Sequence, residues 1–172
     1  MLKLLGSILI GTASIGLALR IIGELKEHLA LLYEVRQLFV DIAGEAAYSL
    51  QPVEHILGGR IRVRDARLTE ICGEIAEKLA MRRDAKGEEV WAAVFEEHKK
   101  LLGLEETELA VIRDAGKAFF GKSMEENEKN LAAYLERLDF LIEGRRREQK
   151  EKQKVIQTVS VMCGLMLIIL LI

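Results

Sequence analysis

The sequence predicts an all-α protein, namely an antiparallel cytoplasmic helical bundle whose first and last long helices continue into N- and C-terminal transmembrane spans. The composition is rich in the helix formers Leu, Ala, Glu, Lys and Arg and contains a single proline. Apolar residues recur at steps of three and four through the middle of the chain, and both ends are apolar. We therefore expect a transmembrane helix at residues 1–22, a cytoplasmic bundle at residues 23–152 and a transmembrane helix at residues 153–172.

The apolar N-terminus, uncharged over residues 4–19, is open to two interpretations. One is a signal peptide with a small-residue cleavage site near Gly16 and Ala18. The other is a retained transmembrane helix, which the orientation of the later basic residues favours. Small residues in the two apolar ends suit close packing between membrane helices, although glycine is also common in such helices generally. The candidate packing residues are Gly6, Gly11, Gly16 and Gly164.

The first helix is expected to extend well beyond the apolar N-terminus, because nothing interrupts it before Pro52. Its apolar positions keep helical spacing over about eight turns, from Ile22 to Leu50. The residue before a proline resists helical geometry, so the helix should end near Leu50. A short helical turn is then expected at residues 52–57, followed by a loop at residues 60–64.

Three more helices are expected in the middle of the chain. Asp65 is a suitable N-cap for the first of them, and Gly103 suits the C-terminal end of the second. The expected ranges are residues 66–81, 88–102 and 105–120, with a connector at residues 82–87. A capping-box pattern at Ser123 and Glu126 then starts the last long helix.

The last helix is expected to run on into the uncharged residues 155–172. At about 1.5 Å per residue this segment is roughly 27 Å long, close to the thickness of a bilayer core. A buried core helix is the alternative, but a core helix usually shows a polar stripe.

A basic belt precedes this segment. Cations grouped on one side of an apolar segment mark the cytoplasmic side of a membrane. The belt also suits contact with anionic lipid head groups. Its six cations are Arg145, Arg146, Arg147, Lys150, Lys152 and Lys154.

The bundle core should be formed by large apolar residues at helical spacing. Trp91 is the only tryptophan, and a tryptophan in such a pattern is more often a core anchor than a binding platform. The expected core residues are Leu32, Phe39, Trp91, Phe95, Phe119 and Leu135.

The chain shows no motif for catalysis or for binding a metal or cofactor. His28, His55 and His98 are isolated in the sequence, and none has a metal-ligand partner four residues later. Cys72 lies in a charged region and Cys163 in the apolar tail, so we expect no disulfide. The formal charge of −2 gives no general attraction to nucleic acid. We therefore expect no enzyme activity, no cofactor, no metal and no nucleic-acid partner.

Five short motifs follow one another along the chain: Met1-Leu2-Lys3-Leu4-Leu5-Gly6, residues 45–53 with Tyr48 and Pro52, Val90-Trp91, Gly116 with Phe119-Phe120-Gly121, and the tail from Cys163. In this order they resemble the stage III sporulation protein AB family of endospore-forming bacteria. The chain departs from the family at Met124 and Glu126, where Asp and Gln are usual, and at Val53, where Leu is usual.

The resemblance implies a platform protein in the mother-cell membrane around the forespore, similar to the inner-membrane platform of type II secretion and type IV pilus systems. The implied partners are the membrane, other sporulation channel proteins and a secretion-type ATPase docked on the cytoplasmic bundle. Formation of homo-oligomers is a further expectation. A membrane-anchored signalling or regulatory module that binds a soluble partner is the alternative function.

Overall fold

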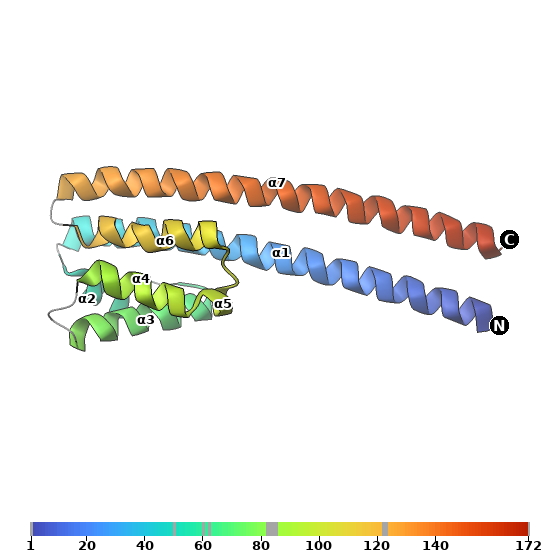
Figure 1. Ribbon diagram of the computed structural model, residues 1–172, viewed down its shortest axis with the longest axis horizontal. Coiled ribbons are helices and arrows are strands. Elements are labelled where there is room, and N and C mark those ends of the chain that lie inside the picture. Colours follow the sequence, from blue (N-terminus) through green and yellow to red (C-terminus); the bar gives the residue numbers. More distant parts are fainter. Residues whose placement is uncertain are drawn as a thin grey trace. The chain divides into compact units, whose positions relative to one another are not determined.

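The structure is a computed structural model that describes residues 2–49, 51–59, 61, 63–81, 86–121 and 124–171. These residues form helices and connecting loops, with no strand among them, so the all-α prediction is confirmed for the described chain (Figure 1). The helices are α1 (Leu2–Ser49), α2 (Val53–Gly59), α3 (Ala66–Met81), α4 (Gly87–Glu97), α5 (Lys99–Leu102), α6 (Glu106–Phe119) and α7 (Met124–Leu171).

The chain divides into two compact units, which we describe separately. The terminal unit comprises Met1–Leu29 and Glu143–Ile172. The bundle unit comprises Ala30–Ile142 and holds all of α2 to α6 together with parts of α1 and α7.

The prediction of two terminal transmembrane spans is wrong for the part of the chain that the structure describes. Within that part, no helix has a stretch both long enough and apolar enough to cross a membrane. The helices themselves are long, but Lys3 and Arg20 limit the uncharged stretch of α1 to residues 4–19. The described uncharged stretch of α7 covers residues 155–171.

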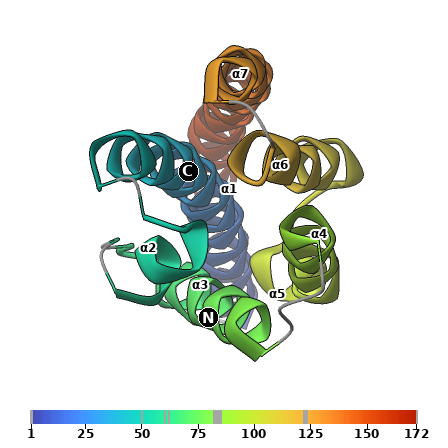
Figure 2. The ribbon, with the colours of Figure 1, turned by 90° about the vertical axis from the view of Figure 1, so that its left-hand side faces the viewer.

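The interior of the bundle unit is built from one face of each helix. Within α1 the buried side chains follow steps of three and four residues and belong to Leu31, Leu32, Val35, Leu38, Phe39 and Ile42. Helices α3, α4 and α6 follow one another around the unit, with α2 packed on α3 (Figure 2). Because these apolar stripes meet in the centre, each helix keeps its charged residues outside or between helices.

The helix ends agree with the local signals in the sequence. Helix α1 ends at Ser49, ahead of Pro52, and α2 ends at Gly59, two residues beyond the predicted end of that helical turn. Gly103 closes α5 in the left-handed conformation, with φ of 66°, which glycine adopts without steric cost. Ser123, the predicted N-cap of the last helix, lies outside the described residues, and α7 begins at Met124.

One predicted helix is interrupted. Residues 88–102 were expected to be continuous, but α4 ends at Glu97 and α5 begins at Lys99. The His98 ring nitrogen Nδ1 lies 3.0 Å from the Val94 carbonyl oxygen, to which the His98 backbone N–H also donates at 3.1 Å. The other ring nitrogen, Nε2, lies 3.4 Å from a carboxylate oxygen of Glu74 on α3. These contacts hold His98 at the junction, where its backbone leaves helical geometry.

Candidate docking surface

The outer face of α1 in the bundle unit carries no charge. Every exposed residue between Ala30 and Tyr48 is uncharged, and together they form what we call the uncharged α1 face: Ala30, Tyr33, Gln37, Val40, Gly44, Ala47 and Tyr48. The corresponding exposed face of α3 carries Glu70 and Glu77. In a chain of which 30% is charged, an exposed helix face without charge is unusual and indicates a contact surface.

The edges of the uncharged α1 face are charged and partly buried. Arg36 donates from Nε and Nη2 to both carboxylate oxygens of Asp139 on α7, at 2.5 and 3.0 Å. The hydrogen bond to Asp139 raises the pKa of Arg36, so Arg36 keeps its positive charge. On the opposite edge, the Glu34 carboxylate accepts the backbone N–H of Arg64 at 3.3 Å. Phe140, next to Asp139 on α7, is 79% exposed.

Ion pairs connect the helices α3 to α6 at their surface. Lys78 on α3 lies 3.4 Å from a carboxylate oxygen of Glu97 on α4, and Arg113 on α6 lies 3.4 Å from one of Glu96. Lys99 on α5 also pairs with Glu106 on α6. Exposed ion pairs contribute little to stability, so the main effect of these pairs is that the charged side chains are already engaged with one another.

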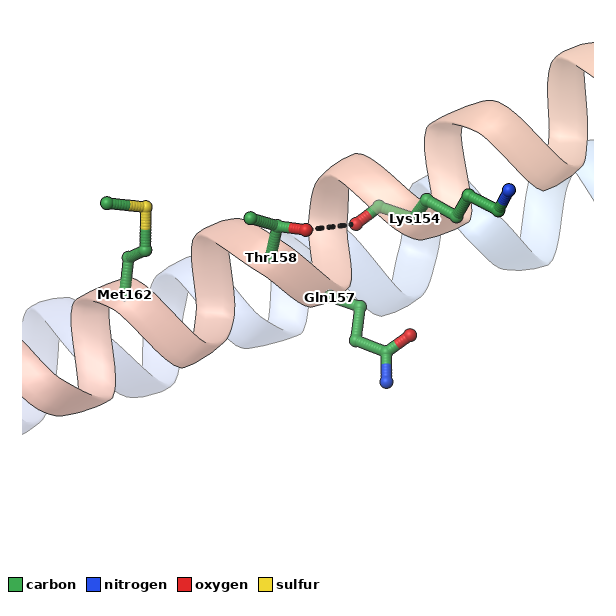
Figure 3. Close-up of a pocket in the computed structure, with 4 residues that line it drawn as sticks. All are labelled: Lys154, Gln157, Thr158 and Met162. Atoms are coloured by element: carbon green, nitrogen blue, oxygen red, sulfur yellow. Dashed lines mark hydrogen bonds between the residues drawn. The ribbon is translucent and has the colours of Figure 1, made fainter.

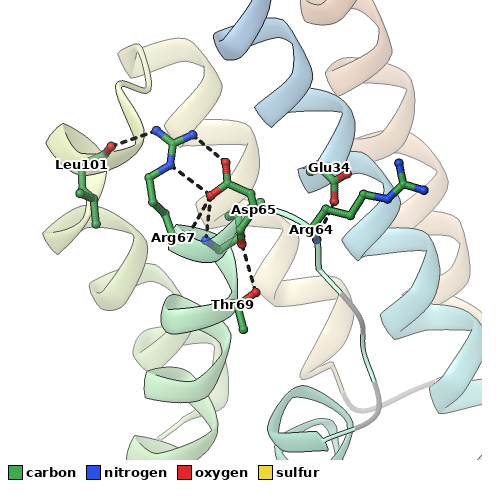
Figure 4. A network of polar contacts seen from close by, with 7 residues as sticks. Glu34, Arg64, Asp65, Arg67, Thr69 and Leu101 are labelled. Atoms are coloured by element: carbon green, nitrogen blue, oxygen red, sulfur yellow. Dashed lines mark hydrogen bonds and ion pairs between the residues drawn. The ribbon is translucent and has the colours of Figure 1, made fainter.

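Asp65 organises the loop before α3 (Figure 4). Its Oδ1 accepts the backbone N–H groups of Arg67 and Leu68, at 2.9 and 3.4 Å, as the sequence predicts for an N-cap. The Arg67 side chain donates back to both Asp65 oxygens and reaches the Leu101 carbonyl oxygen at 3.4 Å. Asp65 and Arg67 therefore fix the start of α3 and connect it with α5.

Replacing Asp65 with alanine should lower the free energy of unfolding by about 1 kcal/mol at pH 7, because the cap is lost. Asp65→Asn keeps a capping oxygen and removes only the charge. The hydrogen bond from Arg67 lowers the pKa of Asp65 in the folded chain, so its charge stabilises the fold above the ordinary Asp pKa. That stabilisation is lost as pH falls through the lowered pKa. Denaturation curves from pH 7 to pH 3 should therefore show wild type and Asp65→Asn converging in acid, and a constant difference would contradict this role.

The sequence-predicted core residues fall into two groups. Leu32, Phe39, Trp91 and Phe95 are completely buried, whereas Phe119 and Leu135 are partly exposed. The Trp91 ring lies 4.8 Å from the Phe95 ring and 5.3 Å from the Phe119 ring, measured between centroids. Its Nε1–H donates to the Ile112 carbonyl oxygen at 2.8 Å. Trp91 therefore joins α4 to α6 at the centre of the bundle unit.

Glu108 is a buried polar residue of α6. It is 1% exposed, and its carboxylate accepts the backbone N–H of Glu105 at 2.9 Å in a capping box at the start of α6. The usual signal was missing because the N-cap is Glu105 instead of Ser, Thr, Asp or Asn.

Four of the six cations of the basic belt pair with two glutamates of α7. Its pairs are Arg145–Glu148 at 3.0 Å, Lys152–Glu148 at 2.6 Å, Arg146–Glu143 at 3.9 Å and Arg147–Glu143 at 3.5 Å. Hydrogen bonds from Lys152 and Arg145 lower the pKa of Glu148. Lys150 and Lys154 are exposed. Glu143 lies two residues before the first arginine of the belt.

An open hollow beside the belt has no features of a ligand site (Figure 3). It is lined by Lys154, Gln157, Thr158 and Met162, which are all exposed and all lie on α7. The Thr158 hydroxyl donates to the Lys154 carbonyl oxygen of its own helix at 3.0 Å. In the residues with described placement, no group of three or more His, Cys, Asp or Glu side chains is arranged to hold a metal ion.

Of the four candidate packing glycines, Gly16 is the one whose surroundings the structure describes. Gly16 is exposed, and no heavy atom beyond its own helix backbone lies within 4 Å of the position that a Cβ would take there. The surroundings of Gly6, Gly11 and Gly164 lie outside the part of the chain that the structure describes.

The two cysteines differ sharply in environment, which predicts different reactivity. Cys72 is 3% exposed, and burial raises the pKa of its thiol to about 12, whereas Cys163 is exposed. At pH 8 only about one Cys72 in ten thousand would be a thiolate, which is the reactive form. Maleimide should therefore label about one thiol per native chain and about two after denaturation, counted by mass spectrometry. Rapid labelling of both thiols in the native chain would contradict the buried position of Cys72.

The family relationship rests on the whole length of the chain. The family model described as stage III sporulation protein AB matches residues 3–172, which confirms the resemblance seen in the sequence motifs. Comparisons with curated proteins and with solved structures found no significant match. The matched region includes both units and all seven of the described helices. The chain therefore belongs to the stage III sporulation protein AB family, and its role is in sporulation.

Proposed function

We propose that this chain is a non-catalytic platform component of a secretion-like channel assembly required for endospore formation, and that its bundle unit docks a cytoplasmic ATPase. The proposal rests on where the polar side chains of the bundle unit lie and on which groups they pair with. Its described interior is apolar except for Glu108, which is engaged in the cap of α6. Its charged side chains pair between helices at the surface. A bundle built in this way offers partners a rigid outer surface.

The proposed location is the mother-cell membrane around the developing forespore. Exposed apolar side chains of the terminal unit support this location, namely Leu19, Ile21, Val155, Val159, Met162 and Met166. Exposed apolar groups near a cluster of cations suit association with an anionic lipid surface or with the proteins embedded in it. In this proposal the terminal unit holds the chain at the membrane surface and the bundle unit meets the ATPase.

Photo-crosslinking in sporulating cells tests the ATPase contact. A photoreactive residue is placed in the full-length chain at exposed positions of the bundle unit, one variant each at Glu77, Glu89 and Lys100. Mass spectrometry should identify a secretion-type ATPase among the crosslinked proteins from at least one position. The matched control carries the probe at Met162, which is equally accessible but lies in the terminal unit.

The control position should capture assembly proteins other than the ATPase. Recovery of channel proteins with no ATPase from any position would remove the motor-docking part of the proposal. Recovery of neither class would overturn the platform role itself.

A further inference from the structure

We propose that the uncharged α1 face binds a second copy of this chain, with the two α1 helices parallel and in register. The proposal does not depend on ATPase docking, because it concerns a different surface and a different partner. Four observations lead to it: the spacing of the face, its lack of charge, an otherwise unexplained glycine, and the charges along its edges.

The spacing of the face matches the seam of a two-stranded coiled coil. Its residues follow alternating steps of three and four over more than two heptads, in the order Ala30, Tyr33, Gln37, Val40, Gly44 and Ala47. Residues at this spacing stay aligned along one side of a helix and can meet the same residues of a parallel partner. Outer faces of many surface helices share the spacing, so the absence of charge is the distinguishing feature here. The next position toward the N-terminus is Lys26, where the uncharged seam ends.

Gly44 lies toward the C-terminal end of this seam, and no contact within the described residues requires glycine there. No heavy atom of the described residues outside its own helix backbone lies within 4 Å of the position that a Cβ would take. A glycine inside a helix is less favourable than alanine. Close approach of another helix backbone at Gly44 would account for the residue, and the neighbouring small side chain of Ala47 permits the same approach.

The charges beside the seam select the partner and its direction. Arg36 directly precedes the seam residue Gln37, and Asp41 directly follows the next seam residue, Val40. Arg36 and Asp41 therefore lie on opposite edges of the seam, five residues apart. In a parallel, in-register coiled coil, residues with this offset face each other across the two chains. Arg36 of each copy would therefore meet Asp41 of the other, and two-fold symmetry would form the pair twice.

An antiparallel arrangement would instead bring equivalent edges together. Glu34 and Asp41 share one edge, so two acidic edges would face each other and repel. Arg36 uses Nε and Nη2 for Asp139, and Nη1 forms no further contact within the described chain. Arg36 can therefore contact the Asp41 of a second copy and keep its bond to Asp139.

The expected affinity is modest. A seam of this length gives an interface at the small end of the range for specific complexes, so we expect a dissociation constant of about 1–100 μM. Because α1 is already folded against the bundle, association does not need to order the helix first.

Disulfide crosslinking of the purified full-length chain tests partner, direction and register together. Three variants carry Cys163→Ser, with Ala30→Cys, Ala47→Cys or both, and Cys72 remains because it is buried. A parallel dimer should give self-crosslinks at residue 30 and at residue 47 in the single variants, and none between 30 and 47 in the double variant. The matched control, Gly73→Cys on the exposed face of α3, should give at least tenfold less crosslinked dimer.

A disrupting substitution completes the test. Val40→Glu should weaken the dimer at least tenfold in analytical ultracentrifugation, whereas Gly73→Glu should leave it unchanged. Circular dichroism and protection of Cys72 from maleimide show whether each variant is folded. A chain that is monomeric at several hundred micromolar, or crosslinks only between residues 30 and 47, would overturn the proposal. If Val40→Glu instead abolishes crosslinking to the ATPase in cells while the wild type is monomeric, the face binds the ATPase and not a second copy.

Discussion

Replacing Trp91 with alanine should lower the free energy of unfolding of the bundle unit by about 3–5 kcal/mol. Trp91 is completely buried, and its ring contacts the rings of Phe39, Phe95 and Phe119. Removing it leaves a large cavity between α4 and α6 and takes away the hydrogen bond to the Ile112 carbonyl oxygen. Denaturant unfolding of the full-length chain, followed by circular dichroism, measures the loss.

The control for this substitution is Phe140→Ala on α7. Phe140 is also aromatic, but it is 79% exposed and should change the free energy of unfolding by no more than about 0.5 kcal/mol. If Trp91→Ala changes stability by less than about 1 kcal/mol, the buried aromatic cluster is not the centre of the fold.

Replacing Gly116 with alanine should destabilise the bundle unit by about 1–3 kcal/mol, although alanine is the better helix former. A Cβ at Gly116 would lie 2.8 Å from Cδ1 and 3.0 Å from Cγ of Trp91. Trp91 is enclosed on all sides and can shift only by disturbing the neighbouring rings. The close contact between α4 and α6 therefore requires glycine at this position.

Gly73→Ala is the matched control, because Gly73 is a mid-helix glycine of α3 with no heavy atom in reach of its Cβ position. It should stabilise the chain by about 0.5–1 kcal/mol through helix propensity alone. The two substitutions should therefore have opposite signs in the same denaturation experiment. A stabilising effect at both positions would show that α4 and α6 pack less closely at Gly116 than described.

Local signals predicted the helix ends well because the atoms that form each end are close in sequence. Pro52 ends α1, Asp65 starts α3 and Gly103 closes α5, and each acts through residues within one turn. His98 interrupts a predicted helix because part of its environment, Glu74, comes from another helix. Periodicity could not show that contact, since it reports which face of a helix is apolar and nothing about the neighbours of that face.

The same limit applies to the core and to the ends of the chain. Helical spacing identified Phe119 and Leu135 as inward residues, but the extent to which neighbouring helices cover them is a property of the whole bundle. The expected transmembrane spans rested on apolar character and on the position of the basic belt. Within the residues that the structure describes, no helix is both long and apolar enough to cross a membrane.

The candidate docking surface could have been found in part from the sequence. Residues 30–48 contain charged side chains, but these fall on the flanks when the helix is drawn with its apolar stripe inward. A search for helix faces without charge would have identified Tyr33, Val40 and Gly44. The exposure of that face depends on where α2 to α7 pack against α1, and only the structure shows it.

Controlled depletion of the chain in sporulating cells tests the platform role most directly. A platform acts in fixed proportion to its partners, whereas an enzyme turns over and remains sufficient at low abundance. The number of heat-resistant spores should fall in proportion to the amount of chain per cell. The amount of ATPase recovered with the chain should fall in the same proportion. Full spore yield when the chain is reduced to a small fraction of its normal level would contradict the platform role.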